Sequence, residues 1–346
     1  MPAKKPWGPA EILAHYPQRY RTVRAEFPGD RAGFSGAIIV RLHCTVGDFC
    51  LRGWPPHQFF ERRILGLHRL LRHVSRQGVS QVAVPVAAEN GTTLIFVRNR
   101  LWQLEPWMPG LADFWGNPDT TRLRAAIECL ANWHRAACSF QPSREESDWF
   151  CCKSAACSPA VSERLSIIFR WNNGECERLR HTMETSPRGE FRELGERILQ
   201  LFERVSPQIA GQLQAARQLR FRLQPCLRDV WHDHVLFTGH EVTGLIDASA
   251  CRFENVATDL SRLLGSFVGD DHNAWDTALE AYAKHRPLTL DELGLVHLLD
   301  RSTVLLSGMT WLERHYLQAK EFVHPKRVNQ RLRTIRRRLE LLGEST

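Results

Sequence analysis

Two aspartates, Asp229 and Asp247, flank a short apolar segment and are the residues of this chain best placed for chemistry. The apolar runs at residues 235–237 and 242–246 predict two strands joined by a turn. Such a hairpin returns its two ends to one edge of the sheet, so we expect both carboxylates there. One acid can then orient or deprotonate a hydroxyl while the other holds a divalent metal on a phosphate, which is the division of labour in phosphoryl transfer.

Each aspartate also has a structural interpretation. An aspartate ahead of a buried strand is often a turn or cap residue, and Asp247, followed by Ala248 and Ser249, fits a turn cap. The two acids together, with the hairpin between them and the later pair Asp259-Leu260, favour the chemical interpretation.

Length and composition are those of an ordinary globular protein. The chain has 346 residues, of which 43% are hydrophobic and 24% are charged, and this is enough for a large core in roughly one to three domains. No apolar run approaches the length of a membrane span, and the first residues lack the continuous apolar stretch of a secretory signal. We therefore expect a cytoplasmic protein without a membrane span.

Ten cysteines raise the question of disulfides or zinc. A chain of this size needs no disulfides for stability, and in a cytoplasmic protein the thiols are kept reduced. Cys151, Cys152, Cys157 and Cys176 cluster in the sequence, but without the C-x2-C pairs typical of structural zinc sites. Reduced, partly buried thiols are the preferred interpretation.

Much of the net charge of +8 lies near the C-terminus, in residues 326–338. Apolar residues recur there at helical spacing from Val328 to Leu342, which predicts an amphipathic helix with a basic outer face. A solvated surface helix packed on the rest of the chain is the favoured interpretation. Contact with nucleic acid or a membrane surface is the less favoured one.

The order of predicted elements divides the chain into a strand-rich beginning and a mainly helical remainder. A connector with two prolines at residues 105–110 separates them. This pattern predicts an α+β fold. Strands are expected at residues 37–44, 49–52, 82–86, 93–97 and 101–104, the first long helix at 57–77, and later helices at 120–138, 162–171, 190–219 and over most of 289–342.

Residues 227–247 resemble the catalytic and metal-binding loops of the aminoglycoside phosphotransferase and choline kinase family, which shares the protein-kinase fold. That family's catalytic loop reads His-Gly-Asp, four residues, then Asn. Its metal loop reads Ile-Asp-Phe or a close variant, before a helix that opens with Asp-Leu. Asp229 matches the catalytic aspartate, Asp247 the metal aspartate and Asp259 the helix-opening acid. The departures are Leu227-Arg228 for His-Gly, His234 for Asn, and Ala248-Ser249 for aromatic-Gly.

The resemblance implies a protein-kinase-like two-lobe fold. Residues 1–105 would form a small strand-rich nucleotide-binding lobe, and residues 106–346 a larger, mainly helical lobe with the catalytic and metal loops. It also implies a phosphotransferase that uses ATP or GTP with Mg2+, in which Asp229 acts on the acceptor hydroxyl and Asp247 holds the metal. His134, in a helix that resembles the one under the family's catalytic loop, is expected to be structural.

His234 puts a nitrogen where the resemblance expects an oxygen ligand, and Mg2+ prefers oxygen. Three interpretations stay open. His234 binds a softer ion such as Mn2+. Alternatively, Asp233 supplies an oxygen from a shifted loop, or His232 and His234 only pack and hydrogen-bond within the loop.

On the nucleotide side, Gly33, Ser35 and Gly36 precede a strand and lie where a kinase-like lobe carries its phosphate-covering loop. An ordinary tight turn is the alternative. Arg52 stands where the resemblance places a strand lysine, and Glu61 on the following helix is its expected ion partner. The alternative for this pair is a surface contact worth at most about 1 kcal/mol.

Glu105 and Trp107 bound the segment where the resemblance places a hinge that binds the adenine base through backbone groups, and Pro106 between them has no amide donor. An antibiotic, a sugar, an amino alcohol and a lipopolysaccharide sugar all fit as the acceptor. The alternative to an active small-molecule kinase is a catalytically impaired, pseudokinase-like binding or scaffold protein, because of the departures at Arg52, His234 and Leu227-Arg228. A nucleic-acid-binding protein ranks third.

Overall fold

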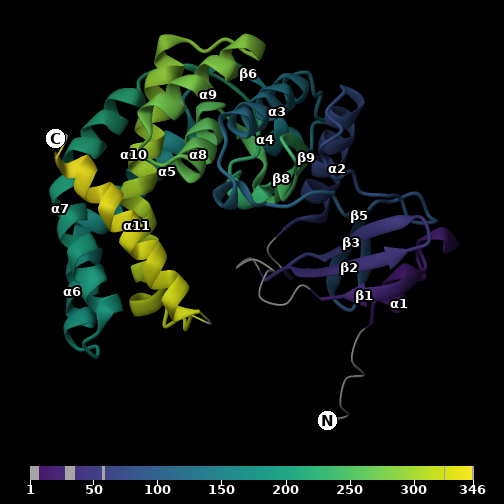
Figure 1. The fold of residues 1–346 in the computed structure, drawn as a ribbon, viewed down its shortest axis with the longest axis horizontal. Helices are drawn as coiled ribbons and strands as arrows, with labels where there is room; N and C mark the ends of the chain where they lie inside the picture. The colour runs from purple at the N-terminus through teal and green to yellow at the C-terminus, as the bar shows by residue number, and fades with distance from the viewer. Residues whose placement is uncertain (1–7, 28–35, 57–58, 323, 345–346) are drawn as a thin grey trace. The chain divides into compact units, whose positions relative to one another are not determined.

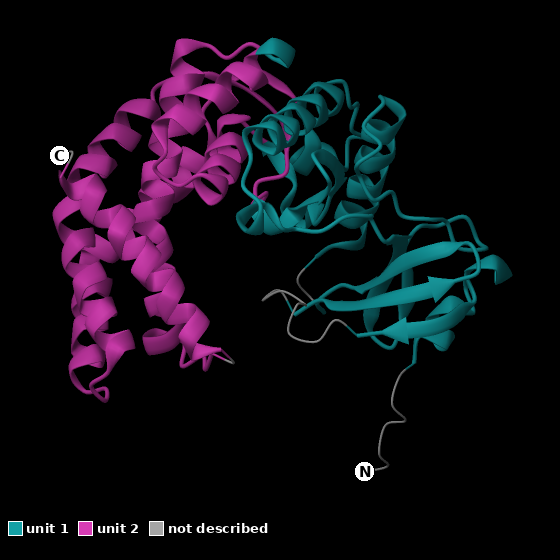
Figure 2. Ribbon diagram, in the orientation of Figure 1, with its two compact units in different colours: residues 1–151, 232–253, 284–286 teal, residues 152–231, 254–283, 287–346 magenta. Residues whose placement is uncertain are grey.

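The computed structural model describes residues 8–27, 36–56, 59–322 and 324–344 (Figure 1). Its internal contacts divide the chain into two compact units, which are coloured differently in Figure 2. The hairpin that ends at Asp247 belongs to the first unit, and Asp229 belongs to the second. The first unit contains residues 1–151, 232–253 and 284–286, and the second contains residues 152–231, 254–283 and 287–346.

An antiparallel five-stranded sheet, in the order β1-β2-β3-β5-β4, is the main β element of the first unit (Figure 1). Along β2, Val40 and Leu42 are both fully buried, which follows from the period of two in a strand. They share a core cluster with Leu51 and Leu104. The strands are β1 (Thr22–Glu26), β2 (Ile38–Cys44), β3 (Gly47–Gly53), β4 (Ile95–Val97) and β5 (Arg100–Pro106).

Most of the predicted strands of this region are present, with two differences. The run at residues 82–86 is loop apart from a single bridge between Val82 and Leu245, because Pro85 has no amide to donate to a ladder. The strand β1 was not predicted, because its residues are exposed or half-buried and lack an apolar alternation.

Helix α2 (Glu61–Arg76) follows β3 and buries Ile64, Leu67, Leu71 and Val74, which recur at intervals of three or four residues. It begins at Glu61, later than the predicted residue 57. The expected start at 57–58 lies outside the described residues.

The first unit also contains helix α3 (Thr120–Cys138), whose bounds match the prediction, and the predicted hairpin. In the hairpin, Val235 pairs with Leu245 and Thr238 pairs with Glu241. The further elements are α1 (Pro9–Leu13), η1 (Gln18–Tyr20), η3 (Phe114–Gly116), α4 (Ser147–Phe150), η5 (His232–His234), β8 (Val235–Thr238), β9 (Glu241–Leu245) and η6 (Ala248–Ala250).

The second unit is mainly helical, as predicted for this part of the chain (Figure 1). Its long helix α7 packs against both α10 and α11, and α10 also packs against α8. The elements after residue 151, apart from the hairpin and the turns η5 and η6 that flank it, are β6 (Lys153–Ala156), α5 (Pro159–Arg170), η4 (Trp171–Glu175), α6 (Cys176–Glu184), α7 (Glu190–Ala216), β7 (Phe221–Cys226), β10 (Arg252–Glu254), α8 (Ala257–Phe267), α9 (His272–His285), α10 (Leu290–Leu312), η7 (Glu313–Leu317) and α11 (Pro325–Glu344).

The predicted basic helix is α11. Its apolar residues Val328, Leu332, Ile335 and Leu339 are buried, so the helix packs with one face while most of its arginines point outward. Among the described residues, no helix combines the length and the apolarity needed to cross a membrane.

The segment after β5 is fastened to the hairpin. Leu111 and Phe237 exchange two backbone hydrogen bonds of 2.9 Å, and Thr243 Oγ1 donates to Pro109 O at 2.8 Å. Gly110 has φ 97°, and a Cβ there would lie 2.3 Å from Thr243 Oγ1 and 2.7 Å from Phe237 O. Only glycine allows this approach, so the sequence itself specifies the contact.

The structure predicts that Gly110→Ala destabilises the protein. The new methyl group would add steric overlap to the left-handed backbone, so we expect the free energy of unfolding in urea to fall by about 2–4 kcal/mol. The matched control is Gly91→Ala, which also has positive φ (83°) but open space around the new Cβ. We expect only about 1–2 kcal/mol there. Equal losses in the two variants would contradict the packing argument.

Candidate active site

Arg52 lies between two carboxylates of the first unit. Its Nη1 donates to Asp247 Oδ1 at 3.0 Å, and its Nε is 3.5 Å from Glu105 Oε1. The register of the sheet explains the second contact: Arg52 on β3 pairs with Gln103 on β5, and Glu105 follows two residues later on the same face. The Arg52 side chain is only 14% exposed, so its charge depends on these partners.

This arrangement corrects the expected pairing of Arg52 with Glu61. Glu61 is the first residue of α2 and is exposed, and Arg52's ion partners among the described residues are Glu105 and Asp247. Glu105 was expected to contribute backbone groups of a hinge. It belongs to β5, and its buried side chain takes the place foreseen for the helix acid.

Trp107 uses its amide within the sheet, where it donates to Asp48 O at 3.0 Å. Its ring packs against the guanidinium of Arg41, 4.9 Å from the ring centroid. Because Pro106 has no N–H, neither residue offers a backbone donor to a base. A nucleotide base bound at the predicted hinge would therefore need another donor.

A chain of buried hydrogen bonds continues from Glu105 to the helix α2. Gln103 Nε2 donates to Glu105 Oε2 at 2.6 Å, and Gln103 Oε1 lies 2.7 Å from Trp54 Nε1 and 2.8 Å from His68 Nε2. An indole N–H only donates, so Gln103 Oε1 is an acceptor and His68 Nε2 carries the proton. His68 Nδ1 then accepts from Thr93 Oγ1 at 2.7 Å.

The charge states follow from this burial. Burial lowers the pKa of His68 to about 4, so the ring is neutral at pH 7. Burial raises the pKa of Glu105, although the charge of Arg52 opposes the shift. Burial also acts to raise the pKa of Asp247, but the charges of Arg52 and His234 outweigh it and the pKa lies below its ordinary value.

Asp247 adopts an unusual backbone conformation, with φ 58° and ψ 62°. Left-handed non-glycine residues are uncommon, although aspartate is among those that tolerate it, and they concentrate at functional sites. The hairpin brings His234 to it: Ile246 N donates to His234 O at 2.9 Å, and His234 Nε2 lies 4.0 Å from Asp247 Oδ2. A cavity of about 30 Å³ adjoins Arg52, Glu105 and Asp247, which is room for about one or two water molecules.

Asp247 and His234 are the residues that could hold a divalent ion here. They offer one carboxylate, which already holds Arg52 on one oxygen, and one imidazole. This donor set suits Mn2+ at least as well as Mg2+, since Mg2+ prefers oxygen ligands and keeps several waters. Asp233, the alternative ligand, has a side chain that is 50% exposed and lies 3.3 Å from His232 Nε2.

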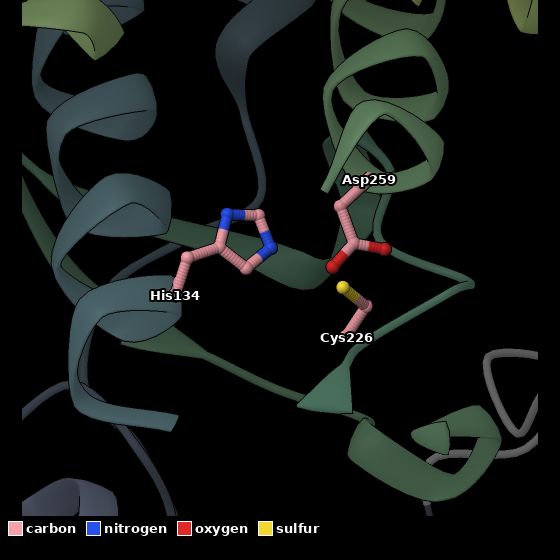
Figure 3. A group of neighbouring side chains, drawn as sticks. All are labelled: His134, Cys226 and Asp259. Atoms are coloured by element: carbon pink, nitrogen blue, oxygen red, sulfur yellow. The ribbon is translucent and has the colours of Figure 1, made fainter. Parts of the chain in front are cut away.

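In the second unit, Asp259 holds the chain just before Asp229. Asp259 is fully buried in the first turn of α8, where Figure 3 shows it near Cys226 at the end of β7. Its two oxygens accept from Leu227 N at 2.7 Å and Arg228 N at 2.6 Å. Arg228 is left-handed, with φ 64°, so these bonds fix a turn that the backbone would otherwise disfavour.

Asp229 itself is half exposed and receives a hydrogen bond from Arg262 Nη2 to its Oδ1 at 2.7 Å. Arg262 lies on α8, one turn after Asp259. Sequence reasoning missed Arg262, as it missed His68 and Gln103. The spacing of three residues from Asp259 was a signal for Arg262, because residues three apart share a helix face.

The predicted phosphate loop is only partly described. Gly33 and Ser35 lie outside the described residues. Gly36 is exposed, has φ 72° and lies two residues before the start of β2, and Arg100 Nη1 lies 3.4 Å from its carbonyl oxygen. His134, expected to be structural, is fully buried in α3.

Comparison with known proteins places this geometry in a family. A model of the phosphotransferase enzyme family matches residues 27–294. The chain belongs to this family. Its protein-kinase-like fold, with a strand-rich N-terminal part and a helical C-terminal part, is therefore confirmed. None of the curated protein sequences matches the chain.

Solved structures of similar fold include an aminoglycoside phosphotransferase from Alicyclobacillus acidocaldarius, with a TM-score of 0.69 and 15% identity over 99% of this chain and 96% of that one. The microcompartment-associated aminopropanol kinase has a TM-score of 0.61 and 13% identity, covering 96% of this chain and 95% of that one. Amicoumacin kinase, in complex with AMP-PNP, Ca2+ and Ami, has a TM-score of 0.60 and 14% identity over 97% of this chain and 92% of that one. At sequence identities this low, the structural similarity shows a shared fold and nothing more.

The lowered pKa of His68 predicts a loss of stability in acid. The unfolded chain takes up the proton near pH 6.5, whereas the folded chain resists it until about pH 4. Stability from this residue is therefore present above pH 6.5 and is lost as the pH falls toward 4, by up to about 3 kcal/mol. Urea unfolding between pH 7 and 4 measures it. His68→Gln should flatten the profile and His181→Gln, at an exposed position on α6, should not; parallel profiles would contradict the assignment.

Asp259→Asn should loosen the loop before Asp229. An amide has one acceptor oxygen, so one of the two backbone N–H groups would face a donor, and we expect a loss of about 2–4 kcal/mol. Amide hydrogen exchange at Leu227 and Arg228 should accelerate. The control, Asp276→Asn on the exposed face of α9, should change stability by less than about 0.5 kcal/mol. Unchanged exchange at both amides would refute the role of Asp259.

Proposed function

We propose that this protein transfers the γ-phosphoryl group of ATP or GTP to a hydroxyl group of a small molecule. The observation that supports it most is the guanidinium of Arg52, held between Glu105 and Asp247 at the end of the hairpin. A fixed cation beside a carboxylate that can hold a metal is what phosphoryl transfer needs, because this reaction depends on positioning and charge neutralisation. Relatives of this fold are named as kinases of small molecules such as spectinomycin and aminopropanol.

In this proposal Asp229 orients the acceptor hydroxyl and accepts its proton. The hydroxyl oxygen forms a bond to the γ-phosphorus while the bond from that phosphorus to the bridging oxygen breaks, and the electron pair leaves with the nucleoside diphosphate. Arg262 orients the Asp229 carboxylate through its bond to Oδ1. A divalent ion held by Asp247 and His234, Mg2+ or Mn2+, would neutralise charge on the phosphates.

A pseudokinase-like binding protein is the second candidate, and one observation favours it. Arg52 contacts Asp247 Oδ1 directly, so a metal must compete with a guanidinium for that carboxylate. Arginine is also larger than the lysine it replaces and keeps its charge at every accessible pH. The two candidates differ in turnover, and nucleotide binding alone does not separate them.

Two variants separate the steps of the proposed reaction. Wild type should gain thermal stability with ATP or GTP and Mg2+ or Mn2+, by about 2.7 kcal/mol at a hundredfold excess of nucleotide over Kd. Asp247→Asn should lose most of this gain. Asp229→Asn should keep the nucleotide-dependent stabilisation, and its turnover rate should fall by at least about 100-fold.

The exposed Asp276→Asn on α9 is the control for a general effect of charge. If the wild-type protein gains no thermal stability with any nucleotide and divalent ion, the kinase proposal is refuted. A stabilised wild type without turnover would favour the pseudokinase-like candidate. Full turnover by Asp229→Asn would refute the role given to that residue.

A further inference from the structure

Arg164, on helix α5 of the second unit, is a cation without an acid partner. Its Nη1 donates to Ala160 O at 3.4 Å and its Nη2 donates to Thr303 Oγ1 at 3.1 Å, and both acceptors are uncharged. It forms no ion pair with a carboxylate of the described part of the chain. Because the side chain is only partly exposed, water does not fully compensate its charge.

The acids near Arg164 already have other partners. Glu163, its neighbour on α5, forms an ion pair with Arg228. Each oxygen of Glu254, at the end of β10, accepts a hydrogen bond of 2.7 Å from the start of α5. Asp300 on α10 is paired with an arginine of α11. The fold therefore leaves the positive charge of Arg164 without a counter-ion.

Two further arginines lie close to Arg164. Arg228 directly precedes Asp229, and its ion pair with α5 brings it toward Arg164. Arg262 on α8 donates to Asp229 Oδ1 at 2.7 Å, and its buried Nε has no hydrogen-bond partner among the described residues. Burial and the charges of these two arginines lower the pKa of Arg164 to about 10, against the opposing charge of Glu254. All three guanidinium groups are thus charged at pH 7 and make the surroundings of Asp229 attractive to an anion.

We propose that Arg164 and Arg228 bind a carboxylate or phosphate group of the acceptor, so that the acceptor of this enzyme is an anion. This inference rests on the proposed transfer of phosphate to a hydroxyl and names the charge of the molecule that carries this hydroxyl. Guanidinium groups bind carboxylates and phosphates through paired, charge-assisted hydrogen bonds. The bound group would supply the counter-ion that Arg164 lacks, while a hydroxyl of the same molecule meets Asp229. All the residues of this subsite belong to the second unit.

The stability of the free protein distinguishes a ligand-binding arginine from a structural one. Arg164→Met keeps most of the length of the side chain and removes its charge. Because an uncompensated charge then leaves a partly buried position, the midpoint of thermal unfolding should rise by about 1–3 °C. An arginine that supported the fold would lower the midpoint when replaced, and such a result would overturn the subsite.

Binding is measured by saturation-transfer NMR on the full-length protein without nucleotide, with a matched set of three-carbon probes. Glycerol 3-phosphate, glycerate, glycerol and 3-aminopropane-1,2-diol share hydroxyl groups and differ in one terminal group. That group is a phosphate, a carboxylate, a hydroxyl or an ammonium. We expect at least one of the two anions to bind, and the neutral and cationic probes to remain unbound. The anion that binds more tightly identifies the group for which the subsite is built.

Variants of the subsite should lose this binding selectively. Arg164→Met should weaken the affinity for the anion about 10- to 100-fold, and Arg164→Lys, which keeps the charge, should weaken it less. The control, Arg337→Gln, removes an exposed arginine of α11 and should leave the affinity unchanged. For an anion that is also phosphorylated, Arg164→Met should raise KM by the same factor at unchanged kcat.

Anion binding that survives Arg164→Met would overturn the subsite, as would an ammonium probe that binds as tightly as the anions. Displacement of the anion by ATP and Mg2+ would also overturn it, because the arginines would then belong to the nucleotide site. Nucleotide-dependent stabilisation of the wild-type protein with neither anion bound would overturn the subsite and leave the proposed function standing. Binding of an anion that depends on Arg164, without any effect of nucleotide, would support the subsite and refute the phosphotransfer proposal.

Discussion

The guanidinium of Arg52, buried between Glu105 and Asp247, is the interaction on which the first unit depends. A charge in this position is costly unless its partners are close and well oriented, and removing one partner of a buried ion pair commonly costs about 3–5 kcal/mol. The three groups come from β3, β5 and the end of the hairpin. The ion pairs therefore join distant parts of the chain, and they hold Asp247 in a backbone conformation that few residues adopt.

The uncharged residues beside Arg52 and its acids explain in which direction the hydrogen bonds of this cluster run. Thr93, His68, Gln103 and Trp54 form hydrogen bonds whose donors and acceptors are all determined by the single N–H of the Trp54 indole. This series of hydrogen bonds ends where Gln103 Nε2 donates to Glu105 Oε2, and the other carboxylate oxygen, Oε1, remains for Arg52. Because each buried polar group has a partner, the cluster can be buried without a large desolvation penalty.

In the second unit, Asp259 also holds an unusual backbone conformation beside a candidate functional residue, but it does so through backbone hydrogen bonds and not through an ion pair. It accepts from two consecutive backbone amides and so stabilises the left-handed Arg228 that precedes Asp229. In the segment after β5, Gly110 permits a close contact with Thr243 and Phe237. Asp229 thus follows a left-handed residue, and Asp247 is itself left-handed. Such backbone positions, which local preference alone would not choose, are typical of sites where geometry matters more than local stability.

Sequence alone determined the hairpin, the bounds of α3 and the amphipathic α11, and it singled out Asp229, Asp247 and Asp259 as candidates, because periodicity, turn residues and a family motif are local signals. It could not determine the partner of Arg52. Glu61 and Glu105 are both acids near a strand cation, and only the register of β3 on β5 and the start of α2 at Glu61 decide between them. Likewise, Phe114 and Trp115, neighbours in the turn η3, are alike as a sequence pattern. The packing of the turn against β8 decides which of the two is buried and which is presented, because burial depends on contacts between residues far apart in the chain.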